Sequence, residues 1–352
     1  MCHTKLHPLL EQLPKCEHHI HIEGSLEPDL LFELAEKNSV KLPVDEDEAF
    51  RSPESLKERY TRFKSLDDFL GYYYIGMSVL ISADDFEALA WAYFSKVATQ
   101  GLKHAEIFFD PQAHLSRGVT YNTLMTGFEA ARKRAEAELG ITSLFICCFL
   151  RHLPPADCLQ VFNQADVQES FTSGQVTGIG LDSSELPFPP NLFKDLYSIA
   201  GALNLRRTAH AGEEGPAQYI KDGLSILNIE RIDHGLKLAT DADLMAQVAR
   251  NKTLLSLCPI SNDLLQCVPD VSHVPVRQFL DAGVHFSINS DDPAYFGSNY
   301  ILENYCAVQE NFDLSVREWE TVCRNAIEGS WCGQERKEEL LKMLEDVIAK
   351  WV

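Results

Sequence analysis

Two histidines near the start of the chain, His19 and His21, have a spacing that suits metal binding. On an extended strand, side chains two residues apart point to the same side, so both imidazoles would face one site. An H-x-H pair alone is weak evidence, because buried structural histidines are more common than ligands. Two further candidates, His210 and Asp291, each follow a short apolar run much later in the chain. Their joint occurrence favours one metal site over four unrelated residues.

The types of these residues indicate zinc and hydrolytic chemistry. Three imidazoles and one carboxylate suit Zn²⁺ and leave positions open for water and substrate. A bound Zn²⁺ lowers the pKa of water to about 7, which supplies a nucleophile at neutral pH. Close to these residues in the sequence, Glu213 could shuttle a proton, and His234 could take the proton of the water. Asp292 could anchor a polar edge of the substrate, although an Asp-Asp-Pro sequence is also typical of a helix start.

The elements that carry these residues must bring them to one place. Strands that alternate with helices favour parallel pairing with right-handed crossovers. Eight such units predict an α/β fold, the closed (β/α)8 barrel, in which catalytic side chains gather at the carboxyl ends of the strands. The first, fifth and eighth runs end on the four candidate ligands. The eight apolar or β-rich runs are 16–22, 104–109, 144–150, 176–181, 207–211, 231–234, 254–258 and 286–289.

The stretch between the first and second runs is unusually long for a crossover. It contains several helix-like segments, one of them around 65–80, and residues 82–85 resemble a capping box at a helix start. In a barrel, such an insertion would lie on the catalytic face, where lids and gates are found. We therefore predict one domain, 1–352, with a helical insertion over roughly 27–101.

The composition argues against several functional classes. The 31 Lys and Arg residues face 52 Asp and Glu residues, which gives a net charge of −21. A surface this acidic repels phosphate backbones and anionic lipids, so we expect neither a nucleic-acid partner nor a membrane. The ten cysteines are scattered without a C-x-x-C pair. We find no signal peptide and no apolar stretch of about 18 residues. We therefore expect a soluble intracellular protein, in the cytoplasm and also compatible with the nucleus.

Five motifs, in order along the chain, resemble the adenosine/adenine deaminases of the amidohydrolase superfamily. The resemblance implies a (β/α)8 barrel whose zinc ion is bound by the four candidate ligands. It implies that Glu213 protonates purine N1 during attack of hydroxide at C6, that His234 orients or deprotonates the water, and that Asp292 meets N7. The products would be ammonia and a 6-oxopurine. The motifs are H-I-H-I-E-G at 19–24, T-A-H-A-G-E at 208–213, R-I-D-H-G at 231–235, C-P-I-S-N at 258–262 and S-I-N-S-D-D-P at 287–293.

Departures from the pattern of the adenosine-specific members favour a free base as substrate. Glu23 stands where those members resemble one another in having an aspartate near the ribose, and its longer side chain would enter that space unless it rotates aside. Ser183 replaces a glycine whose amide meets N3, and either Asp182 or Ser183 could contact a free imidazole N–H such as N9–H. Asp233 replaces a glycine before His234. The resemblance is therefore strongest to adenine deaminases.

We accordingly predict a small-molecule purine base as partner, with adenine converted to hypoxanthine and ammonia, a reaction of purine salvage. Adenosine and N6-substituted adenines remain open as alternative substrates. A non-catalytic barrel protein would be expected to have lost a ligand or the acid, and this sequence retains all of them. The resemblance also suggests that Phe63, Leu66, Phe69 and Leu70 belong to a helix that caps the pocket with an apolar wall. Core packing is the simpler explanation for at least two of these four side chains.

Overall fold

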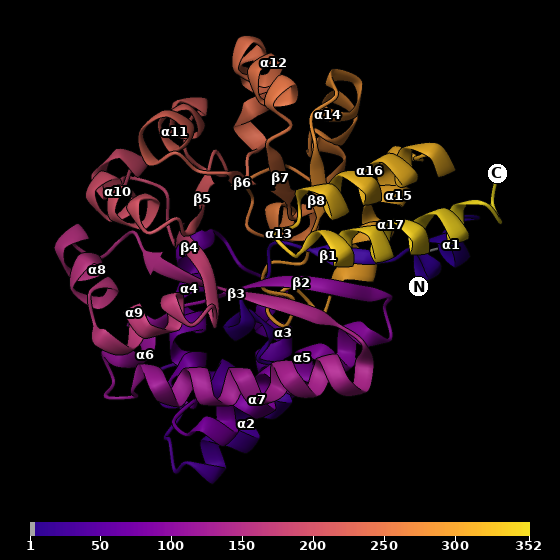
Figure 1. Cartoon of the computed structure of the whole chain (residues 1–352). Helices are drawn as coiled ribbons and strands as arrows, with labels where there is room; N and C mark the ends of the chain where they lie inside the picture. Colours follow the sequence, from indigo (N-terminus) through magenta and orange to yellow (C-terminus); the bar gives the residue numbers. More distant parts are fainter. Residues whose placement is uncertain (1–3) are drawn as a thin grey trace.

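The barrel predicted from the eight runs is confirmed. The structure, a computed structural model, describes residues 4–352. Its eight strands are all parallel and pair in chain order, so their carboxyl ends meet at one mouth of an α/β barrel (Figure 1). The strands are β1 Lys15–Glu17, β2 Leu102–Phe109, β3 Thr142–Leu150, β4 Val176–Asp182, β5 Arg206–Ala211, β6 Arg231–His234, β7 Leu254–Leu257 and β8 Phe286–Ile288.

Helices surround the strands in chain order. Figure 1 shows α5 and α7 on one side, then α8 to α11, then α12 and α14, and finally α16 and α17 beside the amino-terminal α1. Within residues 4–352, none of the helices combines the length and the apolar character needed to cross a membrane. The helices are α1 His7–Gln12, α2 Pro28–Lys37, α3 Pro53–Tyr60, α4 Leu66–Met77, α5 Ala83–Ala98, α6 Pro111–Leu115, α7 Tyr121–Leu139, α8 Pro155–Phe162, α9 Ala165–Thr172, α10 Lys194–Ala202, α11 Ala217–Asp222, α12 Ala242–Asn251, α13 Pro259–Leu264, α14 Val276–Ala282, α15 Ile301–Phe312, α16 Val316–Gly329 and α17 Gln334–Ile348.

The first and last strands meet beyond their regular ends. β1 is shorter than the predicted run 16–22, and the chain after it forms an isolated parallel bridge between Ile20 and Asp291. The backbone N–H of Asp291 donates to the carbonyl of His19 at 3.0 Å, and the N–H of His21 donates to the carbonyl of Asp291 at 3.0 Å. These two hydrogen bonds close the barrel at the level of the candidate metal ligands.

The segment between β1 and β2 is helical, and its parts differ in role. α5 packs on β2 and α7, so it is the crossover helix of the first barrel unit, and the added elements are those from α2 to α4. The N–H of Ser82 donates to the Asp85 carboxylate at 2.8 Å, which is one half of the capping box predicted for α5. Ser65 caps α4 by accepting a hydrogen bond from the N–H of Asp68 at 3.2 Å.

A buried ion pair crosses the barrel interior near the amino ends of the strands. The Arg231 guanidinium on β6 donates to the Glu106 carboxylate on β2, and both side chains are at most 1% exposed. The backbone N–H of Trp331 donates to the other oxygen of Glu106, and the Trp331 ring lies 4.2 Å from the guanidinium carbon. Burial favours the neutral acid, but the charge of Arg231 outweighs it and holds the pKa of Glu106 below its usual range.

We expect Glu106→Gln to lower the free energy of unfolding by about 3–5 kcal/mol, because it leaves the Arg231 charge buried without its partner. Urea unfolding at pH 7 measures the loss, and Glu136→Gln on the exposed face of α7 is the control. Because the pKa of Glu106 is lower in the folded protein than in the unfolded chain, where a Glu carboxyl titrates near pH 4.3, its charge stabilises the folded state above about that pH. The difference between wild type and variant should therefore shrink as the pH falls below that value. An unchanged free energy of unfolding at pH 7 would contradict this role.

Candidate active site

Three histidines and one aspartate meet at the carboxyl end of the barrel, as the sequence predicted. One potential ligand atom from each lies within 4.8 Å of those of the other three, and all four residues are buried. Oδ1 of Asp291 lies 3.1 Å from Nε2 of His19 and 3.5 Å from Nε2 of His21. Nε2 of His21 in turn lies 3.3 Å from Nε2 of His210. This donor set fits a divalent metal ion, since each imidazole presents the same nitrogen to one shared centre.

Neighbouring side chains hold the outer nitrogens of these rings. Nδ1 of His19 lies 3.0 Å from Oγ of Ser256, which donates to Oδ1 of Asp233 at 3.0 Å. Nδ1 of His21 lies 3.5 Å from Oδ2 of Asp182. Such contacts fix the tautomer and orientation of a metal-binding imidazole. Ser256 was not predicted from the sequence, and Asp233 was considered only as evidence for the type of substrate. In the structure, Asp233 supports the candidate ligand His19 through Ser256.

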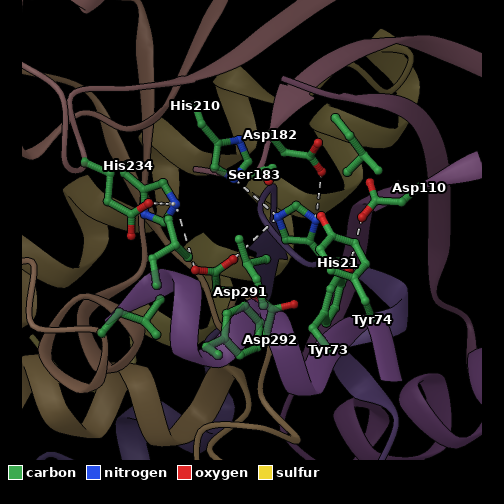
Figure 2. A pocket seen from close by; sticks show the side chains of 16 residues that line it. His21, Tyr73, Tyr74, Asp110, Asp182, Ser183, His210, His234, Asp291 and Asp292 are labelled. Atoms are coloured by element: carbon green, nitrogen blue, oxygen red, sulfur yellow. Dashed lines mark hydrogen bonds and ion pairs between the residues drawn. The ribbon is translucent and has the colours of Figure 1, made fainter. Parts of the chain in front are cut away.

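Glu213 and His234 line the pocket next to this cluster, and Figure 2 shows His234 on the far side of Asp291 from His21. Nε2 of His234 is 3.4 Å from Oε2 of Glu213 and 3.8 Å from Oδ2 of Asp291. Asn262, within the fourth sequence motif, donates to Oε1 of Glu213 at 3.1 Å and lies 3.2 Å from Nδ1 of His234. Burial first, and then the charge of Asp291, raises the pKa of Glu213 well above its usual range, which favours the protonated carboxyl. Burial lowers the pKa of His234 well below its usual range, so its ring is neutral.

The loops that carry these groups have constrained backbones. His234 and Asp291 have φ angles of +60° and +66°, in the left-handed region that few non-glycine residues occupy and that Asp and His adopt more readily than most. The Glu185 carboxylate after β4 accepts hydrogen bonds from the backbone N–H groups of Gly212, Glu213 and Gly215 at 3.2, 3.1 and 2.7 Å. Glu185 therefore fixes the loop after β5 on which Glu213 is presented.

Asp292 lines the pocket beside the candidate ligand Asp291. Its Oδ1 is buried without a hydrogen-bond partner among residues 4–352, which suits an atom that awaits a substrate. A Cβ atom on Gly24 would lie 2.1 Å from this oxygen. The third residue after His21, Gly24, must therefore be glycine, because any larger side chain would displace Asp292.

Helix α4 forms an apolar wall over the pocket. Leu66, Phe69 and Leu70 line it together with Tyr73 and Tyr74, to which the sequence argument gave no role. The empty volume is about 410 Å³, part of which is open to solvent. A flat ring of the size of a purine suits this space between an apolar wall and the polar groups at the strand ends.

Phe63 differs from the three residues predicted with it. It precedes α4 and is not among the described residues that line the pocket. Its ring packs against Tyr60 and Phe69 with centroids 5.6 Å apart in each case. Core packing, which the sequence argument also considered, therefore explains Phe63.

Of the two orientations considered for Glu23 from the sequence, the structure has the one in which the side chain rotates aside from the substrate space. The side chain is fully buried and turns away from the pocket. Its Oε1 accepts hydrogen bonds from the Asp110 N–H at 3.1 Å and from Nε2 of His114 at 3.0 Å. Among residues 4–352, Glu23 is not one of those that line the pocket. His114 lies 91 residues away in sequence, so no local pattern could have shown this partner.

The two residues predicted after β4 both line the pocket, with different contacts. Oδ2 of Asp182 faces His21, while its Oδ1 is buried without a partner among the described residues. Oγ of Ser183 lies 2.8 Å from Nδ1 of His152, and its φ of +72° explains why a glycine can occupy this position. Burial, and then the neighbouring charge of Asp110, raises the pKa of Asp182 well above its usual range.

Comparison with known proteins agrees with this geometry. The family model described as adenosine deaminase matches residues 14–347. The chain is 54% identical over 352 residues to the adenine deaminase of Aspergillus oryzae, covering 100% of this chain and 99% of that protein. It is 50% identical over 346 residues to the adenine deaminase of Saccharomyces cerevisiae, covering 97% and 98%.

A solved structure shows the same fold over nearly the whole chain. The crystal structure of adenine deaminase from Arthrobacter aurescens superposes with a TM-score of 0.90 at 39% identity, covering 96% of this chain and 99% of that one. The match spans the barrel and every motif found in the sequence. This chain is a member of the adenosine deaminase family in the amidohydrolase superfamily.

Proposed function

We propose that this protein hydrolyses adenine to hypoxanthine and ammonia. The main support for a hydrolytic deamination is the contact of Glu213 with His234 beside the cluster of three histidines and Asp291. The substrate is supported by relatives that are named adenine deaminase and match this chain over its whole length. It is also supported by the pocket itself. Among the described residues its lining includes several carboxyls and neither lysine nor arginine, so it offers the phosphate of a nucleotide no cationic side chain of that kind.

The metal that we propose is zinc. It would be held by His19, His21, His210 and Asp291, since imidazole nitrogens with one carboxylate suit Zn²⁺ better than the hard cations. When bound, the ion lowers the pKa of a water molecule to about 7 and so makes a nucleophile available at neutral pH.

The residues of the chain would supply the remaining chemistry. A purine ring resists attack at C6 unless its N1 is protonated as the nucleophile arrives, and the proton that burial keeps on Glu213 serves this purpose. The neutral ring of His234 takes the proton from the attacking water, and Asn262 keeps these two side chains together. Asp292 meets N7 and thereby sets the rotation of the ring in the pocket, while α4 excludes bulk water from one face.

A panel of purines tests the substrate assignment. Zinc-loaded protein is incubated with adenine, adenosine, AMP and N6-methyladenine, and kcat/KM is measured from the absorbance change and from ammonia release. We expect the highest kcat/KM for adenine and no turnover of AMP. Faster turnover of adenosine, or of N6-methyladenine, would replace the substrate proposed above. Absence of turnover of all four purines by metal-loaded protein would refute the enzymatic function.

We expect Glu213→Gln to retain the metal but to lose about 10²- to 10⁴-fold in kcat, because the amide cannot deliver a proton to N1. Steady-state kinetics with adenine and metal analysis of the purified variant measure the two properties separately. Glu214→Gln, a change at the half-buried neighbour outside the pocket, is the matched control and should leave kcat unchanged. Near wild-type kcat in Glu213→Gln would contradict the proton-donor role.

Removal of the metal should destabilise the protein, because an ion that binds only the folded state adds about 4 kcal/mol at a concentration 1,000 times its Kd. Differential scanning calorimetry after chelation should show a lower Tm that added Zn²⁺ restores. Asp291→Ala should abolish this restoration, whereas Asp270→Ala, at an exposed position far from the cluster in sequence, should preserve it. A Tm that is indifferent to Zn²⁺ in the wild type would argue against the site.

A further inference from the structure

Asp110 is a buried pocket residue to which neither the sequence motifs nor the mechanism above gives a task. It follows β2 directly, is 1% exposed and lines the pocket. Its Oδ1 is buried and has no hydrogen-bond partner among residues 4–352. Burying a carboxylate oxygen in this way costs free energy unless a ligand completes its hydrogen bonding.

The surroundings of Asp110 hold it in place and leave that one oxygen available. The Glu23 carboxylate accepts a hydrogen bond from the Asp110 backbone N–H at 3.1 Å, and the Tyr73 hydroxyl donates to Oδ2 at 3.3 Å. Asp182 is the other nearby acid. Its Oδ2 faces Nδ1 of the candidate ligand His21, and its carboxyl shares a hydrogen bond with that of Asp110, so the described residues offer the free Asp110 oxygen another acid but no N–H donor. Ser183 has its hydroxyl engaged with His152. One oxygen of Asp110 lies within 4.8 Å of a nitrogen of His21 and of an oxygen of Asp182, but among residues 4–352 Asp110 forms no ion pair with a candidate ligand.

The position of Asp110 corresponds to the imidazole side of a bound purine. In Figure 2 it lies at the opposite end of the pocket from His234, with His21 between them. If C6 sits at the metal and N7 meets Asp292, the five-membered ring extends away from His234, toward Asp110. The nitrogen next along that ring is N9, which carries a proton in adenine and a sugar in adenosine.

We propose that Asp110 accepts a hydrogen bond from N9–H of the purine and so selects the free base over its nucleoside. This inference rests on the proposed function and refines its specificity. Adenosine has no proton at N9, so its binding would leave the Asp110 oxygen buried without a hydrogen bond. Polar sites reject an analogue most strongly when the analogue lacks a hydrogen-bonding group that the site requires. The sugar would also need space behind Asp110, where Glu23 and His114 are fully buried against each other. Glu23 thus influences specificity through Asp110 and without touching the substrate.

The test compares adenine with 9-methyladenine, which differs only by the loss of this N–H and the gain of one methyl group. Wild-type protein loaded with zinc should prefer adenine by roughly 10⁴-fold in kcat/KM. Asp110→Ala removes the acceptor and opens space, and it should lower kcat/KM for adenine by about 10- to 150-fold, the range of a hydrogen bond to a charged group. The loss should appear mainly in KM, because the contact is the same before and during attack at C6.

The same substitution should raise kcat/KM for 9-methyladenine, so that the preference for adenine largely disappears. Asp110→Asn keeps the size of the side chain and serves as the second variant if Asp110→Ala folds poorly; it should weaken adenine binding without admitting the methyl group. Asp157→Asn, which removes a carboxylate from the exposed face of α8, is the control and should retain the wild-type preference. Metal content of every variant should equal that of the wild type.

Two outcomes separate this inference from the proposed function. If the wild type deaminates adenine and 9-methyladenine equally well, or if Asp110→Ala retains the full preference, the role of Asp110 is refuted and adenine deamination stands. If no purine is turned over, calorimetric titration with hypoxanthine and 9-methylhypoxanthine still tests Asp110. Tighter binding of hypoxanthine that Asp110→Ala abolishes would support the contact, and equal binding of the two would refute it.

Discussion

The rest of this structure depends on one constraint, the close approach of buried imidazole nitrogens to one another. Nε2 of His21 lies 3.3 Å from Nε2 of His210, next to the carboxylate of Asp291. Such lone pairs repel one another unless a cation lies between them, so the rings must be held from outside. The surrounding strand ends do this. Ser256 and Asp233 hold His19, and Asp182 faces His21. Much of the polar character at the mouth of the barrel therefore serves to orient the cluster, and a smaller part of it faces the substrate.

The fold and the cluster could be predicted from the sequence because both follow from simple geometry. Eight alternating units imply a closed barrel, and a barrel brings the ends of distant strands together. The side-chain directions around the pocket could not be predicted in this way. Glu23 turns toward His114, Phe63 lies ahead of the Ser65 cap and packs in the core, and Tyr73 turns into the pocket. Each of these depends on partners that only the folded chain brings close.

Recognition of the substrate is divided between the two ends of one small space. At one end, Glu213 and His234, to which we assign the proton transfers, lie in contact beside the cluster of candidate ligands. At the other end, carboxyl groups stand on a packed wall whose outer layer is itself acidic. In such a pocket, substitutions of residues that pack behind the lining can change which substrate binds, while the groups that carry out the reaction remain in place. Glu23, which contacts Asp110 from behind the wall, stands where a change of that kind would act.

The seam between the first and last strands has a consequence for how such a protein can evolve. The backbone of Asp291 exchanges hydrogen bonds with His19 and His21, and its side chain reaches the nitrogens of the same two residues. Joining the first strand to the last and assembling the cluster of candidate ligands are thus a single event. A substitution at this seam would disturb both the closure of the barrel and the candidate ligands. A substitution in the insertion from α2 to α4 would disturb neither. New specificities in this architecture should arise in the insertion and the wall, and the seam should be the last part to change.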